Sequence, residues 1–90
     1  MKALVVRTAF KKDLKRIVKR GYDRALLEGV IDLLRHGLPL PEARRDHPLK
    51  GDWRNWRECH VAPDWLLIYR MTADEVLLAR TGTHADLFEE

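Results

Sequence analysis

Residues 65–71 read WLLIYRM, a nearly continuous apolar run that contains Trp65 and Tyr69. Such a run is typical of a strand in the middle of a sheet, where both faces are covered. Residues 75–81, EVLLART, have the pattern of its hairpin partner, with residues 72–74 as the turn. Residues 53–61 are a further strand candidate, so the second half of the chain predicts a three-stranded meander.

Working toward the N-terminus, the pattern changes from strand to helix. Residues 3–6 (ALVV) suggest a short strand, Thr8 is the expected cap of a first helix, and Gly21 follows its end. Asp23 is the expected cap of a second helix, which Gly37 ends. The two apolar stripes at helical spacing are Phe10, Leu14, Ile17 and Val18, and Leu27, Val30, Ile31 and Leu34.

The order of elements predicts the fold class. Strand, helix, helix and three strands follow one another, and residues 84–88 add a short helical turn. Because helices and strands are segregated, we expect an α+β fold with two N-terminal helices packed on one face of a small antiparallel sheet. The other face stays open for a ligand. At 90 residues, the chain is expected to form one domain over 1–90.

Basic residues are concentrated near the N-terminus. The chain has 17 Lys and Arg against 14 Asp and Glu, and nine of the basic residues fall within residues 1–24. The positive electrostatic field of such a cluster of charges attracts polyanions such as nucleic acids. The pattern equally fits a solvated helix face, and the sequence leaves both interpretations open.

The remaining composition indicates the compartment. Cys59 is the single cysteine and cannot form an internal disulfide, which favours a reducing environment. No apolar run approaches the roughly 18 residues of a membrane span. The apolar stretch near the N-terminus is too short for a signal-peptide core, so we expect a cytoplasmic protein with no membrane partner.

Three histidines lie late in the chain at loops or strand ends: His47, His60 and His84, with Asp64 between the last two. RNA cleavage by its own 2′-OH needs a base, an acid and positive charge at the phosphate, and these side chains with Arg57 and Arg80 suit those tasks. Unrelated surface histidines are the alternative.

Three other interpretations of these residues carry less weight. Their spacing matches no familiar metal motif, which argues against a metal site. Strand alternation places Cys59 opposite His60, against a Cys–His pair. The aromatics Trp53, Trp56 and Trp65 fit either the core or base stacking, with the core favoured. Phe88 follows His84 at i+4. Its ring fits base stacking and hydrophobic docking equally well.

Several of these residues form a recognisable series. The motif residues, in chain order, are Asp46-His47-Pro48-Leu49, Gly51, Arg57, His60-Val61, Pro63-Asp64-Trp65, Leu67-Ile68-Tyr69, Arg80-Thr81-Gly82-Thr83-His84 and Leu87-Phe88. With them the chain resembles the YafQ branch of the RelE/ParE toxin superfamily. The resemblance runs from about residue 38 to 88, whereas the helical half matches only in layout.

The resemblance implies a RelE-like, microbial-RNase-like fold and a type II toxin that cuts mRNA in the ribosomal A site. It implies metal-free chemistry with no cofactor, and a toxin–antitoxin hetero-oligomer with a small cognate antitoxin. The family's catalytic positions correspond to His47, His60, Asp64 and His84, supported by Trp65 and Phe88.

Individual roles follow as hypotheses from the resemblance. We expect His84 to be the general acid, Asp64 or His60 the base or its orienting group, and His47 with Arg80 the phosphate-stabilising groups. The first helix would then contact ribosomal RNA through its basic residues Lys11, Lys15 and Lys19. A ParE-like gyrase inhibitor and a non-catalytic ribosome- or RNA-binding module remain the alternatives, although the ParE branch lacks the histidine set.

Overall fold

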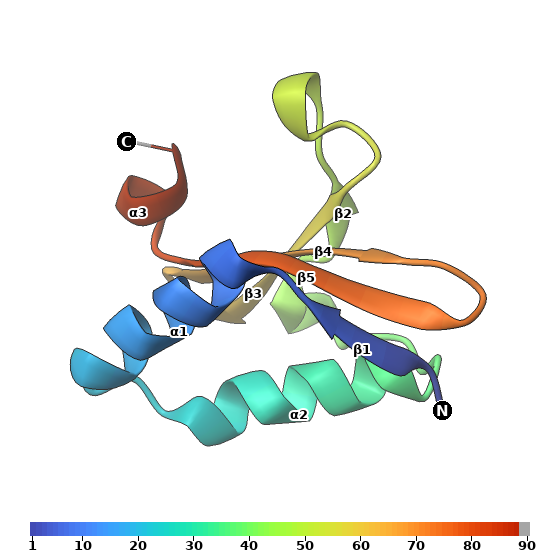
Figure 1. Cartoon of the computed structure of the whole chain (residues 1–90), viewed down its shortest axis with the longest axis horizontal. Helices are drawn as coiled ribbons and strands as arrows, with labels where there is room; N and C mark the ends of the chain where they lie inside the picture. The colour runs from blue at the N-terminus through green and yellow to red at the C-terminus, as the bar shows by residue number, and fades with distance from the viewer. Residues whose placement is uncertain (89–90) are drawn as a thin grey trace.

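The computed structural model describes residues 1–88, which form a sheet with two long helices against one of its faces (Figure 1). The elements in chain order are β1 (Ala3–Val6), α1 (Thr8–Lys19), α2 (Arg24–Arg35), the 3-10 turn η1 (Glu42–Arg44), β2 (His47–Pro48), the 3-10 turn η2 (Gly51–Trp53), β3 (Arg57–Ala62), β4 (Trp65–Met71), β5 (Glu75–Gly82) and α3 (His84–Phe88). The expected α+β fold is confirmed.

The sheet is mixed, and this is one difference from the expected antiparallel arrangement. Its five strands lie in the order β1-β5-β4-β3-β2, and β1 runs parallel to β5 while all other neighbours are antiparallel. The long connection through α1 and α2 allows β1 to join the edge of β5 in either direction, so its sequence pattern could not fix the orientation.

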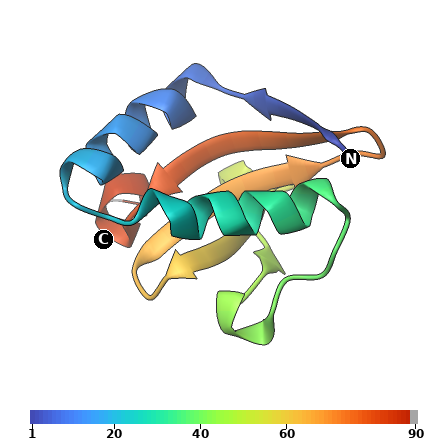
Figure 2. The same ribbon diagram turned by 90° about the horizontal axis from the view of Figure 1, so that it is seen from below.

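Helices α1 and α2 cover one face of the sheet, as Figure 2 shows from below. The core on that side is built from the apolar helix stripes and from alternate residues of β3, β4 and β5. Val18 is the exception among the expected stripe residues, since it is 42% exposed and lies outside the core. Its fully buried members include Ile17 and Leu34 from the helices and Cys59, Trp65 and Tyr69 from the strands. This packing orients the opposite side of the same strands away from the helices.

Local signals explain most of the element boundaries. Asp23 caps α2, since its side chain accepts a hydrogen bond from the Ala25 amide at 3.0 Å. The expectation for Thr8 was wrong: Arg7 is the cap residue of α1, and Thr8 is already helical. The expected strand 53–61 begins only at Arg57, because η2 occupies its start and Asn55 has a left-handed backbone (φ 74°).

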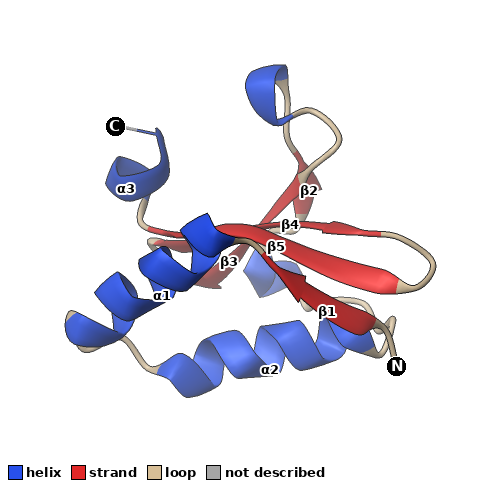
Figure 3. Ribbon diagram, viewed as in Figure 1, coloured by secondary structure: helices blue, strands red, loops and turns tan. Residues whose placement is uncertain are grey.

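The sheet face turned away from α1 and α2 is called the open face here. It carries Trp56, Glu58 and His60 from the β3 segment and Leu66, Ile68 and Arg70 from β4, because these residues alternate with the core residues and Glu58 pairs with Ile68. Helix α3 and the loop containing η2 both rise on this side of the sheet (Figures 1 and 3). Among residues 1–88, no helix is long and apolar enough to cross a membrane.

Candidate active site

His84 begins α3 and is paired with Asp64 in the turn between β3 and β4. Its Nδ1 lies 2.7 Å from Asp64 Oδ1, and its backbone amide donates to the same oxygen at 3.2 Å. An ionised carboxylate can only accept hydrogen bonds, so His84 Nδ1 carries a proton in this pair. These two hydrogen bonds hold the pKa of Asp64 below its usual value. Asp64 therefore engages Nδ1 of the His84 ring and not Nε2.

His60 lies beside His84 on the open face, near the end of β3. Their ring centroids are 5.9 Å apart. His60 Nδ1 lies 3.3 Å from the Pro63 carbonyl oxygen, which can only accept, so this contact favours a proton on Nδ1. His60 Nε2 is then 3.8 Å from a carboxylate oxygen of Glu58.

Glu58 is a residue that the sequence analysis did not single out. It is 5% exposed and lies between two histidines, with Oε1 at 3.8 Å from His60 Nε2 and 3.9 Å from His47 Nε2. The contact with His47 exists because β2 pairs with β3 in a register that places His47 opposite Glu58. Strand alternation from His60 would have pointed to Glu58, but nothing in the sequence revealed the pairing of β2.

The four predicted catalytic residues are therefore brought together. Contacts run in one series from Asp64 to His84, His60, Glu58 and His47. His47 is the most peripheral member, and its Nδ1 lies 2.7 Å from the carbonyl oxygen of Arg45. A row of histidines and carboxylates on a sheet face can transfer protons in both directions near neutral pH.

The helical turn that carries His84 is fixed by Asp86. The Asp86 carboxylate accepts hydrogen bonds from Arg20 Nη1 at 2.7 Å and Nη2 at 3.1 Å, and from the Thr83 amide at 3.0 Å. The Thr83 hydroxyl accepts from the Asp86 amide in return, at 3.2 Å. This reciprocal pair is the geometry of a capping box, which defines where a helix begins. The Arg20 hydrogen bond lowers the pKa of Asp86 to about 2.

The two arginines expected at the RNA are both paired with carboxylates. Arg80 donates to Asp13 through Nε at 2.6 Å and Nη2 at 3.0 Å, and Asp13 is buried. Arg57 Nε donates to Asp46 at 3.1 Å, and the Tyr69 hydroxyl donates to the same oxygen at 2.5 Å. Both guanidinium groups are thus held by a carboxylate of the protein, while the side chains stay 40% (Arg57) and 28% (Arg80) exposed.

Trp65 requires a correction. It was expected to support RNA binding, yet it is fully buried, its indole N–H donates to the Thr81 hydroxyl at 2.8 Å, and its ring packs edge-on against Tyr22. Trp65 is a core residue and cannot stack on a base. Phe88, by contrast, is only half-buried and lies in the same short helix as His84.

Two other groups lie apart from the histidines. Lys11, Lys15 and Lys19 are exposed along α1, in the helical layer, and with Leu14, Val18 and Arg24 they border a shallow hollow. Cys59 is fully buried on the helix side, and burial raises the pKa of its thiol to about 12. It is thus an inert core residue, as its alternation with His60 predicted.

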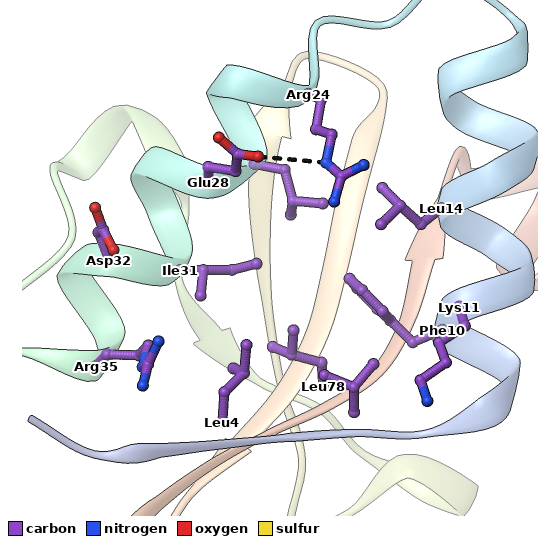
Figure 4. A pocket seen from close by; sticks show the side chains of 12 residues that line it. Leu4, Phe10, Lys11, Leu14, Arg24, Glu28, Ile31, Asp32, Arg35 and Leu78 are labelled. Carbon is purple, nitrogen blue, oxygen red and sulfur yellow. Dashed lines mark ion pairs between the residues drawn. The ribbon is translucent and has the colours of Figure 1, made fainter.

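A second hollow, between β1, α1 and α2, has a volume of about 400 Å³ (Figure 4). Its lining is mostly apolar and includes Leu4, Phe10, Ile31 and Leu78. An ion pair between Arg24 and Glu28, with Nε and Oε1 3.3 Å apart, stands at its rim. It contains no histidine, so it offers none of the acid–base chemistry of the open face.

The residues of the open face could also bind a metal ion. One ligand atom each of Glu58, His60 and His84 lies within 4.8 Å of the others. Imidazole nitrogens with one carboxylate oxygen suit Cu²⁺, Zn²⁺ or Ni²⁺. Such an ion would compete with protons for imidazole nitrogens of His60 and His84.

Comparison with known proteins shows what this chain is similar to. Residues 2–89 match the family model described as bacterial toxin of type II toxin-antitoxin system, YafQ. The mRNA interferase toxin YafQ of Escherichia coli is 46% identical over 80 residues, which cover 88% of this chain and 87% of that protein.

Solved structures extend the likeness to three dimensions. A crystal structure of Escherichia coli YafQ matches with a TM-score of 0.91 and 40% identity, over 98% of this chain and 99% of that one. A complex of that toxin with DinJ, described as a toxin-antitoxin complex, matches at 0.89 with 42% identity over 97% of each chain. A copper-bound mutant toxin from Helicobacter pylori matches at 0.92 with 41% identity, over 98% and 100%.

The fold and the cluster of histidines define a small α+β toxin of the RNA-cleaving class. The chain belongs to the YafQ family of type II toxin–antitoxin toxins, whose curated Escherichia coli members are named mRNA interferases, that is, endoribonucleases.

Proposed function

We propose that this chain is an endoribonuclease that cleaves mRNA in the ribosomal A site and so inhibits translation. The observation that carries the proposal is the series of contacts from Asp64 through His84, His60 and Glu58 to His47. It supplies acid and base groups on one face of a rigid sheet, as a phosphate transfer by the RNA's own 2′-OH requires.

In the proposed reaction, the 2′-oxygen forms a bond to the adjacent phosphorus while the bond from phosphorus to the 5′-oxygen breaks. His84, in its protonated form, gives the proton from Nε2 to the leaving 5′-oxygen. Asp64 holds the ring through Nδ1 and stabilises the charged imidazole, so its role is to orient the acid. Of the two roles first considered for Asp64, the geometry favours this one.

The base is proposed to be His60, which accepts the proton of the 2′-OH through Nε2. Glu58 lies 3.8 Å from that nitrogen and would stabilise the imidazolium that forms. His47, joined to the same carboxylate, would place positive charge beside the phosphate oxygens when protonated. Because Arg80 is bound to Asp13, we assign it the task of fixing β5 against α1 rather than binding phosphate.

The partners follow from charge and family. The exposed Lys11, Lys15 and Lys19 of α1 are proposed to contact ribosomal RNA, whose phosphates are recognised by charge and not by sequence. We also propose a small cognate antitoxin as the partner that keeps the toxin inactive, because a relative of this chain is solved in a toxin-antitoxin complex. With these two partners, we also propose a cytoplasmic location for the chain.

The test uses purified protein in a defined translation system, with ribosomes in one arm and naked message in the other. We expect new RNA 5′ ends at fixed codon positions only with translating ribosomes, and none with His84→Ala. Equal cleavage of naked message would remove the ribosome from the mechanism. Absence of cleavage by the folded parent, together with inhibition of DNA supercoiling, would instead favour a ParE-like gyrase inhibitor.

A second proposal concerns metal ions. A relative from Helicobacter pylori is described as copper-bound, and Glu58, His60 and His84 here have suitable ligand atoms. Since an ion on these residues would withdraw both imidazoles from proton transfer, we propose that Cu²⁺ or Zn²⁺ inhibits cleavage and is not needed for it. Activity that is lost with a chelator and restored by the metal would contradict this.

A further inference from the structure

Two arginines lie against the same indole ring on the open face. The guanidinium carbon of Arg70 is 4.7 Å from the Trp56 ring centroid, and that of Arg7 is 5.6 Å from it. The indole of Trp53 meets Trp56 edge-on, with centroids 6.0 Å apart. These residues come from three distant parts of the chain, and Arg7, Trp56 and Arg70 are called the Arg–Trp–Arg cluster below.

The backbone fixes all three members of this cluster. The Arg7 amide donates to the Leu78 carbonyl oxygen at 3.1 Å, which holds the end of β1 against β5. Arg70 lies on β4 opposite Leu77, and Trp56 directly precedes β3. Strand alternation places Trp56 and Arg70 on the same face as His60. Trp56 and His60 are four positions apart, which corresponds to about 13 Å along the strand.

Arg7 and Arg70 lack the aspartate partner that three other arginines of the chain have. Arg20, Arg57 and Arg80 are each joined to an aspartate. Within residues 1–88, by contrast, Arg7 and Arg70 form no ion pair with any carboxylate. Two cations near one ring repel each other, and an anion between them would relieve that repulsion.

We infer that the Arg–Trp–Arg cluster is a phosphate-binding subsite for the RNA strand, about 13 Å along β3 from the catalytic histidines. The inference rests on the proposed function, because it assumes that the polyanion on this face is RNA. A guanidinium stacked on an indole keeps its N–H edge free, and that planar edge matches two oxygens of a phosphate. Binding of this kind is independent of base sequence.

The subsite gives the open face two separate parts. Cleavage takes place where α3 brings His84 to His60, and the strand is held at the other end of β3 by the cluster. A second contact of this kind positions the scissile phosphate, since it restricts how the strand can slide past the histidines. It also assigns the RNA contact to arginines other than Arg57 and Arg80.

The experiment measures binding of a fluorescent single-stranded 2′-O-methyl RNA, which cannot be cut because it lacks the free 2′-OH. Its Kd is measured against salt concentration for the parent, Arg7→Gln, Arg70→Gln and a control, Arg24→Gln. Arg24 carries the same charge but lies on α2, paired with Glu28. Each loss of a single-strand phosphate contact lowers the slope of log K against log salt by about 0.7.

We expect both cluster variants to bind more weakly for every RNA sequence tested, with the reduced slope, and Arg24→Gln to match the parent. Trp56→Phe should keep most of the affinity because it keeps a ring for the arginines, whereas Trp56→Leu should lose it while thermal unfolding shows an intact fold. Unchanged slopes and affinities for both arginine variants would overturn the subsite, as would a parent that binds no oligonucleotide.

Binding and cleavage together distinguish a failure of the proposed subsite from a failure of the proposed nuclease function. If the parent cuts message and the cluster variants bind and cut like it, the subsite is wrong and the nuclease assignment stands. If the parent binds the oligonucleotide through the cluster but never cuts RNA, the subsite stands and the proposed catalysis fails.

Discussion

Arg20 at the end of α1 and Asp86 in α3 form a bidentate ion pair, with N–O distances of 2.7 and 3.1 Å. The pair joins the helical layer to the short helix that carries His84, although the two residues are 66 positions apart in the chain. A five-residue helix has little stability of its own, so such an anchor is needed to hold a catalytic side chain in place.

Asp86→Ala is therefore expected to lower the cleavage rate by roughly 10- to 100-fold without contacting substrate, because small displacements of an acid are costly. Asp86→Asn, which can retain the Thr83 hydrogen bonds but loses the charge, should lie between the parent and Asp86→Ala. Single-turnover cleavage measures the effect, and Glu28→Ala, which removes an exposed ion pair on α2, is the control. Equal rates for Asp86→Ala and the parent would show that α3 needs no anchor.

Low pH should reduce the stability of the fold through protonation of Asp86. The folded pKa of Asp86 is about 2, below the roughly 3.9 of an unfolded aspartate. Its stabilisation is therefore complete above about pH 4 and is lost as pH falls through about 2. Urea unfolding at a series of pH values should show the stability difference between the parent and Asp86→Asn shrinking across this window. A difference independent of pH would contradict the ion pair.

Glu58→Gln should reduce cleavage while the fold is retained. Glu58 touches both His60 and His47, and the amide keeps its shape but cannot stabilise an imidazolium. A cleavage rate equal to that of the parent would mean that Glu58 serves only the strand pairing.

The buried pair of Asp13 and Arg80 is expected to act on stability. Asp13→Ala leaves Arg80 and the Thr81 amide without their partner, and breaking a buried pair in this way typically costs about 3 kcal/mol or more. Asp13→Asn combined with Arg80→Met should be less destabilised than Asp13→Ala, because no charge is left unpaired. Denaturant unfolding measures both. If Asp13→Ala unfolds like the parent, the structural assignment of Arg80 is wrong.

Local patterns predicted the strands and helices well. The run at β4, the helix stripes and the Asp23 cap each depend on residues near one another in sequence, and the structure bears them out except at Val18, which is exposed. The direction of β1 was missed because pairing at a sheet edge is decided by distant contacts.

The same distinction between local sequence patterns and distant contacts applies to the candidate active site. His60, Asp64 and His84 lie in short motifs, but the part of Glu58 depends on the two-residue strand β2, whose sequence carries no strand pattern. Likewise, the pairing of Arg80 with Asp13 joins positions 67 apart, so the sequence could not show that its charge is already used. Trp65 shares a motif with Asp64 yet faces the core, because Asp64 lies in the turn before β4 whereas Trp65 is the first residue of that strand.

The most direct test of the account is the cleavage rate of the parent and of His84→Ala, measured against pH on the same translated message. General acid catalysis typically contributes about 10²- to 10⁴-fold, so the variant should be slower by that order. It should also lose the fall in rate at high pH, where the parent's acid is deprotonated. A His84→Ala variant that cleaves at the parent's rate, with the same profile, would contradict the assignment of the acid and with it the proposed mechanism.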